Sequence, residues 1–328
     1  MKIAINGFGR IGRCVARILL AEHPECLVKI NDVGDWEMLA YLFQHDSVHG
    51  IYSQDVELGK SKLVVGDHIL EITQSADPQD LDLSGIDVLL ETSGKFSNIP
   101  ALEVFRERGA KKVILGAPFE NVDPNNPATF VLGVNHHLYD NQPIISNASC
   151  TTNALAPICM LLDEHFGIKS ALLTTIHSYT QGQALVDGIG STDKRRCRAA
   201  HNIIPTTTRS AQALHLVLPQ LKDKMHGRSV RVPTMDVSMI DLSARLGRSI
   251  PTETLVDVFK QASQECLLNI LEMDSHYKVS ADIIGNCASC VVIEDMAFSL
   301  GQHAKIMAWY DNEWAYAKRL VEMAFYIH

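Results

Sequence analysis

A glycine-rich turn near the N-terminus, with the sequence GFGRIG, constrains the fold of this chain more than any other feature. It follows a predicted buried strand, Lys2 to Asn6, and precedes a predicted helix, Arg13 to Glu22. Gly7 permits the tight turn, Gly9 lets a pyrophosphate approach the backbone, and Gly12 allows the helix to pack on the strand. A flexible turn is the alternative, but the order strand, glycines, helix favours a dinucleotide site.

An acidic residue follows the second predicted strand, Leu27 to Asn31. Asp32 lies twenty residues past Gly12. At that place an acidic side chain accepts hydrogen bonds from an adenosine ribose and repels a 2′-phosphate. The sequence therefore predicts NAD in preference to NADP.

Strands alternate with helices through the first half of the chain, which predicts an α/β fold with a doubly wound parallel sheet. The further predicted strands are Lys62 to Val65, His68 to Ile72, Val88 to Glu91, Lys112 to Leu115 and Phe130 to Leu132, with helices at Trp36 to Phe43 and Pro100 to Arg108. Ligands bind at the carboxyl ends of strands in such sheets. The loops that begin at Thr92 and Gly116 should therefore border the cofactor, although either could be an ordinary turn.

The composition is that of an ordinary globular protein. A length of 328 residues suggests two domains, and a net charge of −9 argues against general binding to nucleic acid or anionic membranes. No apolar run is long enough to span a bilayer, and the glycines that follow the sixth residue do not fit a signal peptide. The eight cysteines are scattered, which favours a reducing cytoplasm.

Two of these cysteines, Cys287 and Cys290, have the spacing of a redox or zinc pair. No second pair accompanies them, and a predicted strand from Cys287 to Ile293 would place their sulfurs on opposite faces. We expect a structural role and no metal site.

A cysteine lies where a predicted strand, Pro143 to Ser146, meets a predicted helix, Thr151 to Phe166. Cys150 would then begin a helix, where unpaired N–H groups and the helix dipole stabilise a thiolate. A nucleophile and a buried free cysteine are both open on position alone. His177, which follows a strand from Ala171 to Ile176, is a candidate base, although a lone histidine is more often structural.

The remaining segments suggest a second domain. Residues 181–202 have no clean periodicity, as is common for functional or interface loops. The later predicted elements are a strand from Val237 to Leu246, a helix from Thr252 to Leu268, a strand from Ala304 to Trp309 and an amphipathic helix to Phe325.

Several motifs together carry a family resemblance. NGFGRIGR, SNASCTTNALAP, TTIHSYT, NIIPTTT, RVPT and WYDNEWAYAKRL resemble the glyceraldehyde-3-phosphate dehydrogenase family in order and separation, from Met1 to His328. The resemblance implies an NAD-binding Rossmann domain at 1–149 and an α+β catalytic domain at 150–312 with a mixed or antiparallel sheet. It also implies a C-terminal helix, 313–328, that packs back on the first domain. A homotetramer is implied too, with the 181–202 loop near a neighbouring subunit's cofactor.

The implied chemistry is oxidation of D-glyceraldehyde 3-phosphate to 1,3-bisphosphoglycerate, in glycolysis or gluconeogenesis. The Cys150 thiolate would attack the aldehyde, and His177 would support it and remove the hydroxyl proton as hydride leaves. Inorganic phosphate would then resolve the thioester. By resemblance, Thr180 and Arg231 hold the substrate phosphate, Ser149, Thr151 and Thr208 hold the attacking phosphate, and Arg195 or Arg196 adds charge. The cofactor residues are then Gly7, Gly9, Arg10, Ile11, Gly12, Asp32, Thr92, Asn312 and Tyr316.

One departure from the family pattern affects the choice of substrate. Arg209 stands where the family usually has glycine, and it is counted with the phosphate-binding candidates. Erythrose-4-phosphate dehydrogenase, which shares the fold, NAD and covalent mechanism but hydrolyses the thioester, resembles this chain in carrying a basic residue there. Thr180 favours the triose enzyme, which we expect.

Two alternatives come from other classes. A non-phosphorylating aldehyde dehydrogenase of unrelated fold would need a longer chain and a glutamate base. A noncatalytic protein that kept the fold would not need Cys150, His177 and Arg231 intact.

Overall fold

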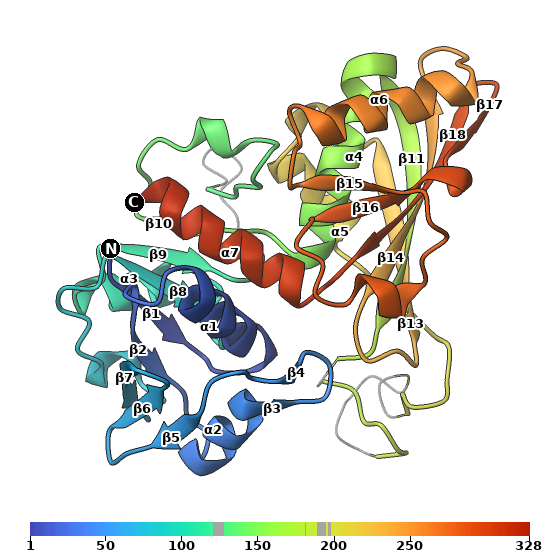
Figure 1. Cartoon of the computed structure of the whole chain (residues 1–328). Coiled ribbons are helices and arrows are strands. Elements are labelled where there is room, and N and C mark those ends of the chain that lie inside the picture. The colour runs from blue at the N-terminus through green and yellow to red at the C-terminus, as the bar shows by residue number, and fades with distance from the viewer. Residues whose placement is uncertain (121–127, 181, 189–194, 196–197) are drawn as a thin grey trace. The chain divides into compact units, whose positions relative to one another are not determined.

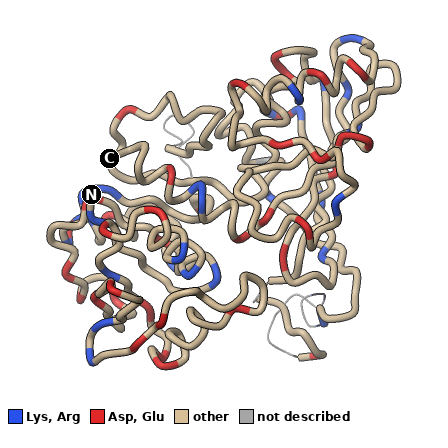
Figure 2. The backbone as a smooth tube through the Cα atoms, viewed as in Figure 1, with Lys and Arg blue, Asp and Glu red and all other residues tan. Residues whose placement is uncertain are grey.

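The computed structural model describes residues 1–120, 128–180, 182–188, 195 and 198–328, drawn in colour in Figure 1. The chain forms two compact units. The first unit contains Met1–Phe130, His136–Ser149 and Tyr316–His328, and the second contains Val131–Asn135 and Cys150–Ala315. Basic and acidic side chains are interspersed within each of them (Figure 2). No helix among the described residues is long and apolar enough to cross a membrane.

The first unit is built on an eight-stranded sheet with the strand order β10-β9-β8-β1-β2-β7-β6-β5. The six strands from β10 to β7 run parallel, and β6 and β5 continue the edge as antiparallel strands. The strands are β1 (Ile3–Asn6), β2 (Leu27–Asn31), β5 (Val56–Leu58), β6 (Lys62–Val65), β7 (His68–Thr73), β8 (Val88–Glu91), β9 (Lys112–Leu115) and β10 (Ile144–Ser146), with a small hairpin of β3 (His45–Asp46) and β4 (Gly50–Ile51). The doubly wound parallel sheet is confirmed.

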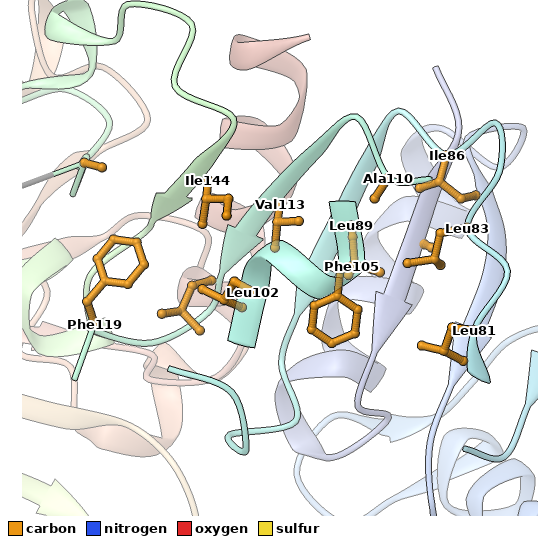
Figure 3. Packing of buried hydrophobic residues seen from close by; sticks show 13 residues of the cluster. Leu81, Leu83, Ile86, Leu89, Leu102, Phe105, Ala110, Val113, Phe119 and Ile144 are labelled. Atoms are coloured by element: carbon orange, nitrogen blue, oxygen red, sulfur yellow. The ribbon is translucent and has the colours of Figure 1, made fainter. Parts of the chain in front are cut away.

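Helices cover this sheet through apolar side chains. The helices of the first unit are α1 (Arg10–Glu22), α2 (Trp36–Gln44), α3 (Ile99–Glu107) and most of α7 (Trp314–Ile327). Leu102 and Phe105 of α3 are fully buried against Leu89 of β8 and Val113 of β9, in the cluster of Figure 3. Because successive side chains of a strand alternate in direction, the other face of the sheet is left for α1.

The C-terminal helix α7 lies beside α1 within the first unit. Lys318 of α7 forms a salt bridge with Glu22 at the end of α1, at 2.5 Å, and the ring centroids of Phe325 and His23 lie 4.1 Å apart. Lys112 of β9 donates to the Ile327 carbonyl near the chain end. These contacts tie the end of the chain to the first sheet.

The second unit contains a mixed sheet with the strand order β12-β13-β11-β14-β18-β16-β15, to which β17 adds beside β18. Its strands are β11 (Ile168–Ser178), β12 (Ile204–Thr206), β13 (Met225–Val232), β14 (Ser238–Leu246), β15 (Leu271–Asp274), β16 (Cys290–Ile293), β17 (Phe298–Leu300) and β18 (His303–Tyr310), and its helices are α4 (Cys150–Phe166), α5 (Ser210–Ala213) and α6 (Thr252–Gln264). The pairs β11–β13 and β15–β16 are parallel and the others are antiparallel. The mixed sheet is confirmed.

Three sequence predictions of local structure are wrong in whole or in part. The predicted strand Phe130–Leu132 is not formed: Thr129 makes a single bridge to Ser146, and the chain then turns, with the Asn135 side chain accepting from the Val131 N–H. The strand predicted from Cys287 begins at Cys290, because an Asn286 side chain bonded to the Ala288 N–H bends the preceding chain. Helix α6 ends at Gln264, before the predicted Leu268.

Candidate active site

The glycine turn of the first unit has the geometry expected for a dinucleotide site. Gly7 has a φ of +96°, and a Cβ there would lie 2.4 Å from the Ser93 Cα. A Cβ at Gly12 would lie 2.0 Å from the Gly7 carbonyl oxygen, whereas a Cβ at Gly9 would meet nothing within 4 Å. Gly9 precedes α1 without a side-chain cap. Open space above Gly9 and the uncapped N–H groups of α1 fit a pyrophosphate.

Asp32 lies immediately after β2 and contacts this turn. Its carboxylate accepts hydrogen bonds from the Phe8 N–H at 2.5 Å and from the Gly34 N–H at 2.7 Å. Each carboxylate oxygen has a second lone pair, so these bonds leave acceptor capacity for a ribose hydroxyl. The carboxylate thus shapes the glycine turn as well as offering the predicted ribose contact.

The other predicted cofactor residues of the first unit mainly make contacts within the protein. Thr92 donates through its hydroxyl to the Gly7 carbonyl at 2.7 Å, and Arg10 forms a salt bridge with Asp46 at 2.5 Å. Ile11 lies in the first turn of α1. Tyr316 of α7 donates from its hydroxyl to the Ala148 carbonyl at 2.9 Å. That bond steadies the turn of residues 147–149, in which Ala148 has a φ of +54° and Ser149 directly precedes the candidate nucleophile.

The second unit brings Cys150, His177 and Arg231 together. Cys150 is the first residue of α4, and His177 is the penultimate residue of β11. Because β11 and β13 are neighbouring parallel strands, their register places Arg231 opposite His177. The Cys150 Sγ lies 3.9 Å from the His177 Nε2, and the Arg231 Nη1 lies 2.6 Å from the His177 Nδ1.

The hydrogen bonds around His177 decide which of its nitrogens can act as a base. Its Nδ1 lies 2.8 Å from the Ser178 carbonyl oxygen, to which the Arg231 Nη1 also donates at 2.7 Å. A guanidinium nitrogen can only donate, so the 2.6 Å contact with Arg231 fits an Nδ1 without a proton, whereas the 2.8 Å contact with the carbonyl fits an Nδ1 that carries one. A base for the thiol proton requires the second tautomer, in which the lone pair of Nε2 faces the sulfur of Cys150.

Burial sets the charge state of the pair. It raises the pKa of the Cys150 thiol, which the Thr151 N–H and Arg231 lower in part and Asp236 raises further. Burial and the Arg231 cation together lower the pKa of His177 to about 3. The imidazole is therefore neutral at neutral pH. At the helix N-terminus the Thr151 N–H acts against the effect of burial on the pKa of the thiol.

Tyr310 belongs to this cluster, although the sequence indicated it only as part of the WYDNEWAYAKRL motif and gave it no role. Its hydroxyl lies 2.9 Å from the Thr151 Oγ1, and its ring packs edge-on against His177 with 6.1 Å between centroids. Tyr310 ends β18, which neighbours β14 in the sheet. Only the order of the strands brings it to the first turn of α4, so the motif alone does not reveal this contact.

Asp236 is a second residue that the sequence analysis missed. It is buried in the link between β13 and β14 and is followed by Val237 with a φ of +64°. Burial and the nearby carboxylates of Asp311 and Glu313 raise its pKa to about 9. Val237, a β-branched residue directly after Asp236, is strained by its positive φ, and a sequence does not reveal strain of this kind.

Asn312 is held by two hydroxyl groups of the second unit. Its amide oxygen accepts hydrogen bonds from the Ser178 Oγ at 3.0 Å and the Ser238 Oγ at 2.7 Å. The amide NH₂ is consequently turned away from these two serines. A fixed amide donor of this kind is suited to bind a carboxamide oxygen.

Comparisons with known proteins agree with this arrangement. A family model described as the C-terminal domain of glyceraldehyde 3-phosphate dehydrogenase matches residues 149–312, and one described as its NAD binding domain matches residues 1–99. The chain belongs to the glyceraldehyde-3-phosphate dehydrogenase family. The glyceraldehyde-3-phosphate dehydrogenase of Helicobacter pylori is 51% identical over 100% of this chain and 99% of its own length. Those of Priestia megaterium and Geobacillus stearothermophilus are 42% and 41% identical, each over 100% of this chain and 98% of its own length.

Membership of the glyceraldehyde-3-phosphate dehydrogenase family confirms the resemblance noted in the motifs. It makes the chain an NAD-dependent oxidoreductase with NAD as its cofactor. The open backbone at Gly9 and the carboxylate of Asp32 fit that cofactor.

The described contacts of the other predicted phosphate-binding residues do not involve Cys150, His177 or Arg231. Thr180 is exposed, and its N–H donates to the Gln183 side chain at 3.3 Å. Thr208 accepts from the Ser210 N–H at 3.1 Å, and Arg209 is exposed at the start of α5. Arg195 donates to the Pro205 carbonyl at 3.2 Å. Arg196 and much of the 181–202 loop fall outside the described residues.

Proposed function

We propose that this protein oxidises D-glyceraldehyde 3-phosphate with NAD and inorganic phosphate to 1,3-bisphosphoglycerate, through a thioester on Cys150. The observation that carries the proposal is the contact of three groups, a thiol, a neutral imidazole base and a guanidinium, in the unit that matches the family's catalytic domain. The curated relatives that are alike over the whole chain carry the name of this enzyme.

The first half of the reaction uses the thiol and the imidazole. The Nε2 of His177 takes the thiol proton as Sγ bonds to the aldehyde carbon, and it returns that proton to the oxygen to complete a thiohemiacetal. His177 then removes the hydroxyl proton while the C–H bond breaks and the carbon becomes a thioester. When bound, NAD supplies the acceptor for the hydride.

Arg231 links substrate binding to the strength of this base. In the structure its cation contributes to the low pKa of His177. A sugar phosphate held by Arg231 would offset that positive charge with a dianion. The pKa of His177 then rises, and the imidazole accepts a proton more readily once the correct substrate is in place.

The second half of the reaction releases the product. An oxygen of inorganic phosphate attacks the thioester carbon, the C–S bond breaks, and the leaving thiolate recovers a proton from the His177 imidazolium. We assign Ser149, Thr151 and Thr208 to the attacking phosphate and Thr180 and Arg231 to the substrate phosphate. Arg195 and Arg209 add positive charge to these phosphate-binding groups.

The cofactor assignments complete the proposal. Gly7, Gly9, Arg10, Ile11, Gly12, Asp32 and Thr92 border the dinucleotide, Asn312 orients the carboxamide, and Tyr316 supports the turn before Cys150. We assign residues 1–149 to the NAD domain, 150–312 to the catalytic domain and 313–328 to the C-terminal helix. We further propose a homotetramer, as the family resemblance implies, and a cytoplasmic location, which the free thiols of the described cysteines support.

A steady-state assay tests the proposal. NAD reduction is followed with glyceraldehyde 3-phosphate or erythrose 4-phosphate, each with and without inorganic phosphate. We expect preference for the triose and a requirement for phosphate. Preference for the tetrose, or activity independent of phosphate, would overturn it. Cys150→Ser should abolish the reaction while NAD binding persists, and persistent turnover in that variant would exclude the covalent route.

A further inference from the structure

A buried carboxyl group lies beneath the glycine turn of the first unit and has no part in the chemistry above. Glu91 ends β8 and is 1% exposed. Its carboxylate accepts hydrogen bonds from the Ser93 N–H at 2.8 Å, from the Ser93 hydroxyl and from the Asn6 amide. A single side chain therefore collects donors from β1 and from the loop after β8.

The loop held by Glu91 is the surface on which the glycine turn rests. Ser93 is the residue whose Cα would lie 2.4 Å from a Cβ at Gly7. Next to it, the Thr92 hydroxyl donates to the Gly7 carbonyl at 2.7 Å. Displacement of residues 92–94 would therefore displace Gly7, because the two backbones are in contact without an intervening side chain.

Glu91 is also the end of a chain of polar side chains that crosses the parallel sheet. The Asn6 amide that donates to Glu91 accepts through its oxygen from the Asn31 amide at 2.7 Å. The Asn31 oxygen in turn accepts from the Thr73 hydroxyl at 2.8 Å. The network joins β8, β1, β2 and β7 at their carboxyl ends. When Glu91 is ionised, each donor of the network points along the chain of side chains toward its carboxylate. A protonated carboxyl would bring a donor of its own, which would face one of these donors.

Glu91 changes charge near neutral pH. Burial raises its pKa to about 7, although the Asn6 and Ser93 hydrogen bonds lower it in part. The strand β1 carries no charged side chain. Charged side chains on the other elements around β8 bond to groups other than Glu91. Lys112 donates to the Ile327 carbonyl, Asp32 accepts from the Phe8 and Gly34 N–H groups, Arg13 donates to the Phe8 carbonyl, Arg106 pairs with Glu103, and Lys29 donates to the Asp82 carbonyl.

We propose that Glu91 is a positioning residue for NAD: its ionised carboxylate holds Ser93, and through Ser93 the glycine turn, in the shape that receives the pyrophosphate. Protonation removes one acceptor from the network, loosens the loop and weakens NAD binding. The proposal rests on NAD as the cofactor and is independent of which sugar phosphate is oxidised. Glu91 acts through the backbone and touches no reacting atom.

Calorimetric titration of the full chain with NAD, without sugar phosphate, tests this positioning role. If NAD binds the ionised form, the dissociation constant rises about tenfold from pH 8 to pH 6, and binding near pH 7 releases about half a proton. The Glu91→Gln variant should bind NAD weakly. It should also lack the contribution of Glu91 to the pH dependence of the dissociation constant and to the proton release. Asp87→Asn is the matched control, because Asp87 precedes the opposite end of β8 and bonds to Lys2 and Lys111. It should keep both.

A second variant keeps the test decisive if Glu91→Gln folds poorly. Ser93→Ala removes one donor to the carboxylate, so the midpoint of the pH dependence of NAD affinity should move to higher pH. A midpoint that does not move, or a Glu91→Gln protein with the affinity and proton release of the parent, would overturn the inference. Either result would leave the proposed reaction standing, since the titration contains no aldehyde.

Discussion

Replacement of Arg231 by glutamine isolates the electrostatic effect of this guanidinium on the nucleophile. Arg231 is one of the groups that lower the pKa of the Cys150 thiol, against the larger effect of burial. Glutamine keeps a polar side chain on β13 but removes the positive charge. We therefore expect the pKa of the Cys150 thiol to rise in the variant.

The size of the effect follows from the distances through His177. The guanidinium lies 2.6 Å from Nδ1, and Nε2 lies 3.9 Å from the sulfur. The cation and the sulfur are therefore about 8 Å apart, and at an effective dielectric constant of about 20 they interact by about 2 kcal/mol. That energy corresponds to a rise in thiol pKa of about 1.5, or about thirtyfold less thiolate at neutral pH.

Alkylation of Cys150 by iodoacetamide measures the thiolate, and mass spectrometry of the Cys150 peptide separates it from the other cysteines. At pH 7 the rate should fall about thirtyfold in Arg231→Gln. Arg231→Lys, which keeps the charge, should recover much of the rate. Arg228→Gln, an exposed arginine on the same strand, should alter it little. Equal rates in the parent and Arg231→Gln would refute the electrostatic role.

Three further predictions concern stability. Tyr310→Phe removes the buried hydroxyl bonded to Thr151, so urea denaturation should show a loss of about 1–2 kcal/mol in the free energy of unfolding; an unchanged midpoint would contradict that bond. Folding raises the pKa of Glu91 from 4.5 to about 7. Between these pH values the folded parent therefore holds a proton that the unfolded chain has lost, and its free energy of unfolding should fall by about 3 kcal/mol as pH rises through them. Glu91→Gln should lack this loss, and identical profiles for both proteins would disprove it. Phe105→Ala, at a fully buried core site, should cost about 3–5 kcal/mol, whereas Phe298→Ala, at a side chain 48% exposed, should cost far less; equal losses would refute the assigned core.

Local patterns in the sequence located most elements of the first unit. The strands Leu27–Asn31, Val88–Glu91 and Lys112–Leu115 have the predicted bounds, because short apolar runs between turn residues are a strong signal for buried parallel strands. The predicted strand Phe130–Leu132 is equally apolar, but its pairing ends with the Phe130 N–H, which donates to the Ser146 carbonyl at 2.9 Å. Strand formation requires a neighbour with unpaired backbone groups, and a single segment of sequence does not reveal one.

The site shows the same division. Cys150, His177 and Arg231 lie in motifs that the sequence exposes, and the strand register then puts Arg231 opposite His177. Neither Tyr310 nor Asp236 had a predicted role: Tyr310 reaches the cluster from the end of a distant strand, and Asp236 lies in a connecting segment without a motif of its own. The place of Cys150 at a helix terminus indicates only one of the effects on its pKa, because burial raises that pKa.

The sequence by itself determined the glycine turn, the cysteine at a strand-to-helix junction and the order of the elements. These depend on backbone freedom and on local periodicity, which act over a few residues. Only the tertiary structure decided that His177 is neutral, that Arg231 contacts the imidazole, and that Glu91 sits buried under the glycine turn. Burial and charge depend on groups far apart in the chain, so these properties exist only once the sheets have formed.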